Sequence, residues 1–150
     1  MAPTPADLQQ VPEALRASPG FLLGKAAQQG AELAERALQP LALKARHYGV
    51  LVSLQDLGPL SQHELGQLLR IDRTTMVAVV DHLERLGFVR RGVHPVDRRT
   101  YQVQLTAAGQ AVVEQARGAT ASADAVLVAR LSGEERAHLV TLLHKLCGLV

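Results

Sequence analysis

Five arginines lie within a fifteen-residue stretch near the centre of the chain: Arg85, Arg90, Arg91, Arg98 and Arg99. Asp97 is the single acidic residue among them, so residues 85–99 carry +4, whereas the whole 150-residue chain carries only +2. The rest of the chain therefore sums to −2. Charge this concentrated repels itself unless a polyanion such as nucleic acid is the partner. The alternative is a solvated hairpin whose charge protects its edges from pairing.

The same stretch has the pattern of a β-hairpin. Residues 88–92 predict one strand, and the alternation of apolar and polar residues over 101–105 predicts the next. Between them, His94-Pro95-Val96-Asp97 is typical of a turn, because proline and aspartate favour turn conformations. The arginines are therefore expected on a protruding basic hairpin.

Two short helices are predicted immediately before the hairpin. Ser61 and Glu64 form a capping box that opens the first, and Asp72 is a good N-cap for the second. Gly87 is a helix stop. The second helix has an inward apolar stripe, formed by Met76, Val79, Val80, Leu83 and Leu86. Its outward residues are Arg73, Thr74, Val77, Ala78, Asp81, His82 and Arg85. A helix-turn-helix of this kind fits a DNA major groove, although small helical domains without any nucleic-acid role also contain it.

Several motifs in this region resemble those of the MarR family of winged-helix transcriptional regulators. Asp97-Arg98-Arg99, followed by Leu105-Thr106 and Gly109, resembles the family's D-x-R…LT-x-x-G wing signature. Residues 71–75 and 80–87 are similar to its recognition helix, and residues 47–51 to its second helix. The resemblance covers about residues 20–150. One departure is Lys44, where many members have a threonine that caps the second helix.

The resemblance implies sequence-specific binding of double-stranded DNA at a pseudo-palindromic operator. Arg73 would meet a guanine edge, Thr74 and Thr75 a base or phosphate, and His82 and Arg85 the DNA backbone. Thr75 has a competing role in the first helical turn, and Asp81 a structural role in fixing a nearby arginine. Arg90 and Arg91 are expected phosphate contacts. Either Arg98 or Arg99 would enter the minor groove; the family's second arginine matches Arg99.

The expected fold is mainly α with a small β-hairpin, in about six helices. Residues 1–19, rich in proline, predict a mobile tail, and residues 20–150 a single domain. The winged helix-turn-helix spans about 43–105, flanked by dimerisation helices at about 20–40 and 106–150. The end helices are amphipathic without an obvious surface to cover, which favours a twofold homodimer over a monomer folded on itself. The final helix is expected to turn inward the residues Leu139, Leu142, Leu143, Leu146 and Val150.

The resemblance further implies a repressor that a small aromatic or phenolic ligand releases from DNA. The helix over about residues 43–56 borders that site in relatives, so Arg46, His47 and Tyr48 are candidate ligand contacts. Tyr48 would stack on a ring, and its neighbours would meet a carboxylate. The alternative is that Tyr48, together with Leu51, Val52 and Leu54, simply fills the core, while Arg46 and His47 are surface residues or phosphate contacts.

Other classes of function find little support. The chain has no G-x-S-x-G, no phosphate-binding glycine loop and no H-E-x-x-H, so no enzyme is predicted. No metal site or cofactor is expected. A redox-responsive regulator acting through Cys147, or a winged helix used for protein contacts, remain the alternatives. A lone cysteine, no signal peptide and no membrane-length apolar run make a cytoplasmic protein the expectation.

Overall fold

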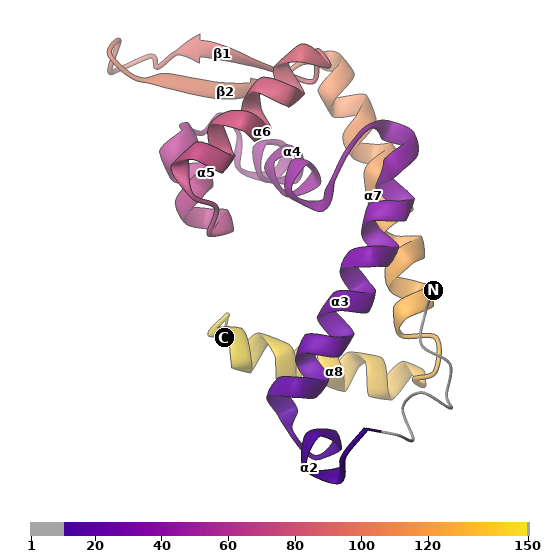
Figure 1. Ribbon diagram of the computed structural model, residues 1–150. Coiled ribbons are helices and arrows are strands. Elements are labelled where there is room, and N and C mark those ends of the chain that lie inside the picture. Colours follow the sequence, from indigo (N-terminus) through magenta and orange to yellow (C-terminus); the bar gives the residue numbers. More distant parts are fainter. Residues whose placement is uncertain (1–10, 150) are drawn as a thin grey trace. The chain divides into compact units, whose positions relative to one another are not determined.

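The computed structural model describes residues 11–149, which are mainly helical and carry one β-hairpin, as predicted (Figure 1). In chain order the elements are α2 (Glu13–Arg16), α3 (Pro19–Leu38), η1 (Gln39–Leu41), α4 (Ala45–Leu57), α5 (Gln62–Leu69), α6 (Arg73–Arg85), β1 (Val89–Val93), β2 (Tyr101–Leu105), α7 (Ala107–Leu127) and α8 (Gly133–Cys147). They divide between two compact units. Residues 34–120 form the winged unit, and the two ends of the chain form the terminal unit.

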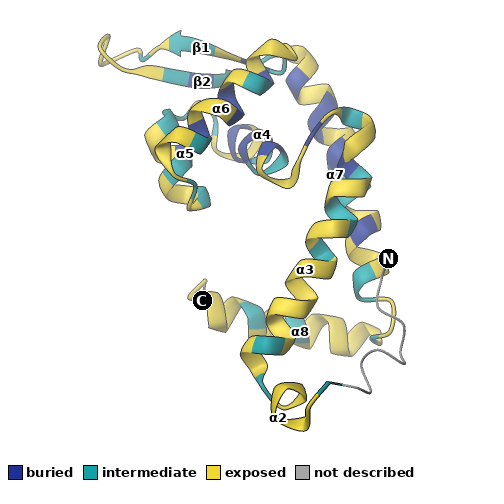
Figure 2. Ribbon diagram, viewed as in Figure 1, coloured by how far each residue is buried: buried dark blue, intermediate teal, exposed yellow. Residues whose placement is uncertain are grey.

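The core of the winged unit lies where α4, α5 and α6 pack on one another and on the hairpin. Its fully buried side chains include Leu51 of α4, Leu65 of α5 and Val103 of β2. Met76, Val79, Val80 and Leu83 supply the face of α6, as the inward stripe predicted, while Leu86 is exposed. The dark blue residues of Figure 2 mark this core.

The helix starts of the winged unit are fixed by local hydrogen bonds. The Ser61 Oγ accepts the amide of Glu64 at 3.2 Å, and the Glu64 carboxylate accepts the amide of Ser61 at 2.7 Å. The Ser61 amide and the Ser61 hydroxyl, which donates to the same carboxylate at 2.8 Å, hold the pKa of Glu64 below its usual value. Asp72 caps α6 by accepting the amide of Thr75 at 2.9 Å. Gly87, with a φ of +75°, follows the last residues of α6. All three features agree with the sequence prediction.

Helix α4 begins without the threonine cap common in the family. The Nδ1 of His47 instead accepts the amide of Lys44 at 3.0 Å, and the Glu35 carboxylate accepts the amide of Ala45 at 3.2 Å. These two acceptors satisfy amides that have no partner within the helix. His47, whose ring serves as the cap, is buried. Tyr48 and Val52, which are predicted in the core, are half-buried.

The wing is an antiparallel hairpin in which Arg90 pairs with Gln104 and Arg91 with Val103. Its first strand is Val89–Val93, one residue later than the sequence predicted. Leu60, which precedes α5, forms an isolated β-bridge with Val103: its amide donates to the Val103 carbonyl at 3.2 Å and its carbonyl accepts from the Val103 amide at 2.7 Å. The wing is thereby attached to the segment that leads into α5.

The base of the wing explains the spacing of the L-T-x-x-G motif. The Thr106 hydroxyl donates to the Gly87 carbonyl at 2.6 Å and accepts the Gly109 amide at 3.0 Å. Gly109 lies so close to the preceding turn that an added Cβ would stand 2.0 Å from the Phe88 carbonyl oxygen. Only glycine fits there, because real Cβ atoms do not approach backbone oxygen so closely.

The terminal unit contains α2, α8 and parts of α3 and α7. A Cβ on Gly30 of α3 would come 3.2 Å from the Leu127 side chain, so this glycine permits a close helix approach. Two predictions differ here. Helix α8, predicted to have an inward stripe, has no buried residue among those described. Helix α2 and the start of α3 lie within the predicted tail, whose residues 1–10, like Val150, lie outside the described part of the chain.

Candidate nucleic-acid interface

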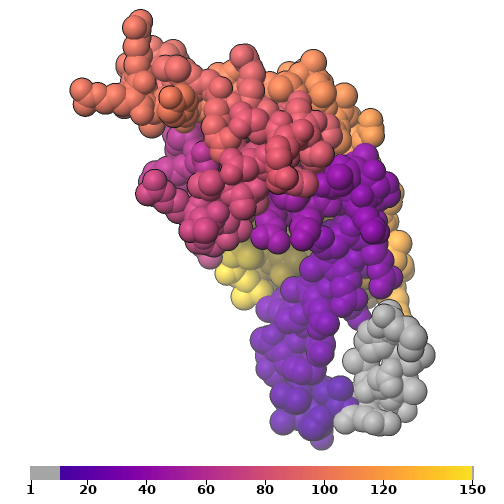
Figure 3. Space-filling model, turned by 45° about the horizontal axis from the view of Figure 1, so that its top comes forward, coloured from indigo at the N-terminus to yellow at the C-terminus, as the bar shows by residue number. Residues whose placement is uncertain are grey.

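Two exposed sets of predicted DNA contacts lie on the winged unit. Arg73 and Thr74 open α6, and Arg85 lies near its end; all three are exposed. Arg90, Arg98 and Arg99 are exposed on the hairpin, which projects from the body of the winged unit (Figure 3). Six of the nine predicted DNA contacts therefore have side chains accessible to a partner.

The wing tip is held rigid by its own side chains. The Nδ1 of His94 accepts the amides of Val96 and Asp97 at 3.1 and 3.0 Å. The Asp97 carboxylate accepts the amide of Arg99 at 3.0 Å. Hydrogen bonds from the Thr100 hydroxyl and the Arg99 amide lower the pKa of Asp97. The aspartate of the D-x-R motif thus shapes the turn that presents the two arginines, both of which are exposed.

Arg91, predicted as a phosphate contact, has carboxylate partners within the winged unit. Its guanidinium pairs with Asp81 at 2.5 Å and with Glu84, both on α6, and donates to Gln62 of α5 at 3.4 Å. Burial acts to lower the pKa of Arg91, but its bonds and charge interactions with Asp81 and Glu84 raise it. With two carboxylates against it, Arg91 ties the wing to α6. This is the structural role for Asp81 that the sequence left open.

Thr75 is likewise occupied. Its amide and its hydroxyl both donate to the Asp72 carboxylate, at 2.9 and 2.6 Å. These bonds lower the pKa of Asp72. The hydroxyl is engaged in starting the helix, so the structure favours the competing helix-turn role over a base contact.

His82 turns away from the position predicted for it. Its Nε2 lies 3.0 Å from the Ala42 carbonyl oxygen and its ring stacks on that of His47, with centroids 4.4 Å apart and planes 16° from parallel. These contacts join His82 to other parts of the winged unit, and its predicted contact with the DNA backbone stays a prediction.

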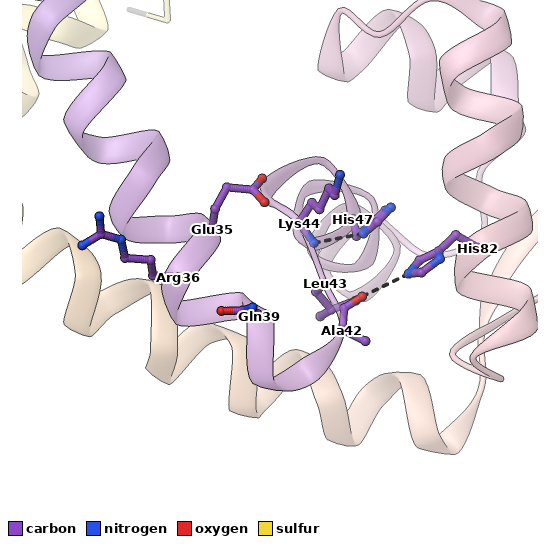
Figure 4. A pocket seen from close by; sticks show the side chains of 8 residues that line it. All are labelled: Glu35, Arg36, Gln39, Ala42, Leu43, Lys44, His47 and His82. Atoms are coloured by element: carbon purple, nitrogen blue, oxygen red, sulfur yellow. Dashed lines mark hydrogen bonds between the residues drawn. The ribbon is translucent and has the colours of Figure 1, made fainter. Parts of the chain in front are cut away.

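These two rings border a pocket of about 460 Å³ (Figure 4). Its lining residues are Glu35, Arg36, Gln39, Ala42, Leu43, Lys44, His47 and His82. Of the predicted ligand contacts only His47 lines it, because Tyr48 packs against the core and Arg46 is exposed elsewhere. Burial, followed by the charges of His82, Arg46 and Lys44, lowers the pKa of His47 to about 4. Two of the lining residues had a sequence signal: His47 as a candidate ligand contact and Lys44 as a departure from the family pattern.

The remaining candidates offer no assembled site. Within residues 11–149, no three side chains of His, Cys, Asp or Glu gather closely enough to hold a metal ion. In that same range no helix is long and apolar enough to cross a membrane. Cys147 is exposed on α8.

The fold and the placement of its basic residues define a winged helix-turn-helix protein. Residues 43–101 match the sequence profile of the MarR family. A putative transcriptional regulatory protein for the hcr operon of Thauera aromatica is 35% identical over 99 residues, or 66% of this chain. The chain spans 60% of the length of that relative.

Solved structures extend the similarity over most of the chain. A probable transcriptional regulator from Pseudomonas aeruginosa is 32% identical, with a TM-score of 0.81, and the match covers 88% of this chain and 98% of that one. A mutant MarR from E. coli, complexed with operator DNA, is 28% identical (TM-score 0.79; 91% and 99% covered). BpsR of Bordetella bronchiseptica, whose DNA binding is regulated by 6-hydroxynicotinic acid, is 27% identical (TM-score 0.81; 91% and 98% covered). The chain belongs to the MarR family of transcriptional regulators.

Proposed function

We propose that this regulator is a homodimeric repressor that binds a pseudo-palindromic operator in double-stranded DNA. One observation carries the proposal: the same winged unit exposes arginines at the start of α6 and at the rigid tip of the wing. These are the two places from which a winged helix can reach a major and an adjacent minor groove. The E. coli relative complexed with operator DNA supports this reading.

The exposed residues divide into two roles. Arg73 and Thr74 would read base edges in the major groove, and Arg98 or Arg99 would enter the minor groove. Arg85 and Arg90 would contact phosphates, which strengthens binding without reading sequence. Arg91, Thr75 and His82, which have partners inside the protein, take no part in this revised set.

The terminal unit supports the dimer. Leu142 and Leu146 lie one helical turn apart on α8 and are 47% and 70% exposed. A second copy of the chain would cover them, and its winged unit would occupy a second half-site about one turn of DNA away, roughly 34 Å.

A small aromatic acid or phenol would release the repressor. The pocket that contains His47 has a volume in the range of small-molecule sites. Its basic groups, Arg36 and Lys44, suit an anionic ligand. In the relative BpsR, 6-hydroxynicotinic acid regulates DNA binding, which supports an effector of this chemical class.

The test is binding to duplexes selected by the protein from a random pool, measured by fluorescence anisotropy across a salt series. We expect tight binding whose log–log salt dependence has a slope of roughly −5 to −9, as for about six to ten neutralised phosphates. The variant Arg98→Ala/Arg99→Ala should lose most of the preference for the selected duplex. A flat salt response would contradict the proposal. So would a finding that neither the unmodified protein nor the double variant prefers the selected duplex to random DNA.

A further inference from the structure

The imidazole ring of His82, in the second half of α6, contacts residues near the start of α4. Asp81 and Arg85, its neighbours on the helix surface, are exposed, whereas His82 is half-buried. Its Nε2 faces a carbonyl oxygen, that of Ala42, at 3.0 Å. A carbonyl can only accept, so the His82 Nε2 carries the proton and donates it. The bond joins α6 to a segment forty residues earlier in the chain.

His47 holds the other face of the His82 ring. The two rings are stacked with centroids 4.4 Å apart, and the Nδ1 of His47 accepts the Lys44 amide at 3.0 Å. Figure 4 shows the ring of His47, from α4, and the ring of His82, from α6, both directed at the short connection between η1 and α4. The pair thus joins α6 to residues 42–44 through a stack and two hydrogen bonds.

We propose that His82 is a positioning residue, which sets the orientation of α6 for DNA through Ala42 and His47 and does not itself contact DNA. The inference rests on the proposed function, since it concerns how that function is achieved. Arg73 lies nine residues before His82, about 14 Å along the helix axis. A small rotation of α6 about the His82 contact would therefore displace Arg73 from a base edge.

A phosphate contact by His82 predicts different behaviour. Loss of a phosphate contact weakens specific and random DNA binding alike and reduces the salt slope. Loss of a positioning contact weakens specific binding alone, because random DNA is held by the phosphate contacts of other residues.

The first test is the titration of His47 by NMR. The charged groups that influence its ring are Glu35 of α3, Lys44 and Arg46 around the start of α4, and His82 of α6. In His82→Ala the pKa of His47 should rise from about 4 toward its usual value of 6.5, because both the cover and the neighbouring charge are lost. An unchanged pKa of His47 would show that the rings are not in contact in solution.

The second test is DNA binding at pH 8 by His82→Ala, with Arg85→Ala as the matched control from the same helix surface. We expect His82→Ala to weaken binding of the selected duplex about threefold to tenfold, the range for one net hydrogen bond, with its salt slope and random-DNA binding unchanged. Arg85→Ala should reduce the slope by about 1.8, because each of the two subunits would lose one phosphate contact. His82→Gln, which retains a donor for Ala42, should recover part of the lost affinity.

The outcomes separate the two proposals. Unchanged binding of the selected duplex by His82→Ala, or a slope reduced as in Arg85→Ala, would overturn the positioning role while the regulator stands. Absence of any DNA preference in the unmodified protein would refute the proposed function, and the positioning role with it, whatever the NMR titration shows.

Discussion

The winged unit and the terminal unit use similar amphipathic patterns and reach different results. Among the described residues, every buried apolar side chain except Ala123 lies in the winged unit. In the terminal unit, α8 has leucines at helical spacing and none is buried. An amphipathic stripe therefore predicts a helix and its apolar face. It does not predict whether another element of the same unit or a second chain covers that face. The winged unit supplies its own; we propose that the terminal unit uses a second copy of the chain.

The largest expected effect is on the base of the wing. Gly109→Ala would force a Cβ to within 2.0 Å of the Phe88 oxygen, so the turn must move and the free energy of unfolding should fall by about 3 kcal/mol or more. Gly118→Ala is the control on the same helix, since its Cβ would meet nothing within 4 Å. It should raise stability by up to about 1 kcal/mol. Urea denaturation measures both, and equal stability of the two variants would contradict this account.

The dimer proposal is tested next through α8. Leu142→Ser with Leu146→Ser should weaken dimerisation by about 2–4 kcal/mol, because two buried interface anchors would be lost. The free energy of unfolding of the single chain should change little, because both leucine side chains are exposed in it. Analytical ultracentrifugation would detect the monomer. Val96→Ser, at an 88% exposed valine of the wing, is the control and should leave the dimer intact. An intact dimer in the double variant would place the interface elsewhere.

The pH dependence of stability tests the burial of His47. Its pKa is about 4 in the folded protein and near 6.5 when unfolded, so on acidification the unfolded chain binds the proton first. Stability is therefore complete above pH 6.5 and falls between pH 6.5 and about 4, by on the order of 2 kcal/mol. His47→Gln, which retains an acceptor for the Lys44 amide, should show a smaller fall. Identical pH profiles for the two proteins would show that His47 is not buried in a neutral form.

The smallest effects compare two adjacent arginines of the wing. Arg91→Met should lower the free energy of unfolding by about 1 kcal/mol, because the partly exposed carboxylates of Asp81 and Glu84 lose their partner. Arg90→Met should leave stability unchanged and instead reduce the salt slope of DNA binding by about 1.8, because both subunits of the dimer carry the substitution. If the two variants exchanged these effects, the assignment of Arg91 to structure and Arg90 to phosphate would be wrong.

Sequence reasoning succeeded where the determining contacts are local. The capping box at Ser61 and the cap at Asp72 each involve residues three apart, so their types and spacing are sufficient. The wing motif also identified the residues at the base and tip of the hairpin, although the strand boundary moved by one residue.

The sequence does not identify a partner that lies far along the chain. The carboxylates that contact Arg91, and the carbonyl and ring that contact His82, lie on other elements and were not predicted. An exposed-face pattern cannot distinguish a free side chain from one that a distant segment holds. For the same reason the sequence predicted only His47 among the residues that line the pocket, since the others come from α3, η1, α6 and the connection between η1 and α4.

The most direct test of the central claim is selection from a random pool of duplexes by the full chain, followed by sequencing. If the winged unit reads DNA as a pair, the enriched duplexes should share two inverted half-sites whose centres lie about 10 base pairs apart. Their enrichment should disappear with Arg73→Ala, the variant at the start of α6. Failure to enrich any sequence, or enrichment that Arg73→Ala leaves unchanged, would contradict a repressor that reads its operator through α6.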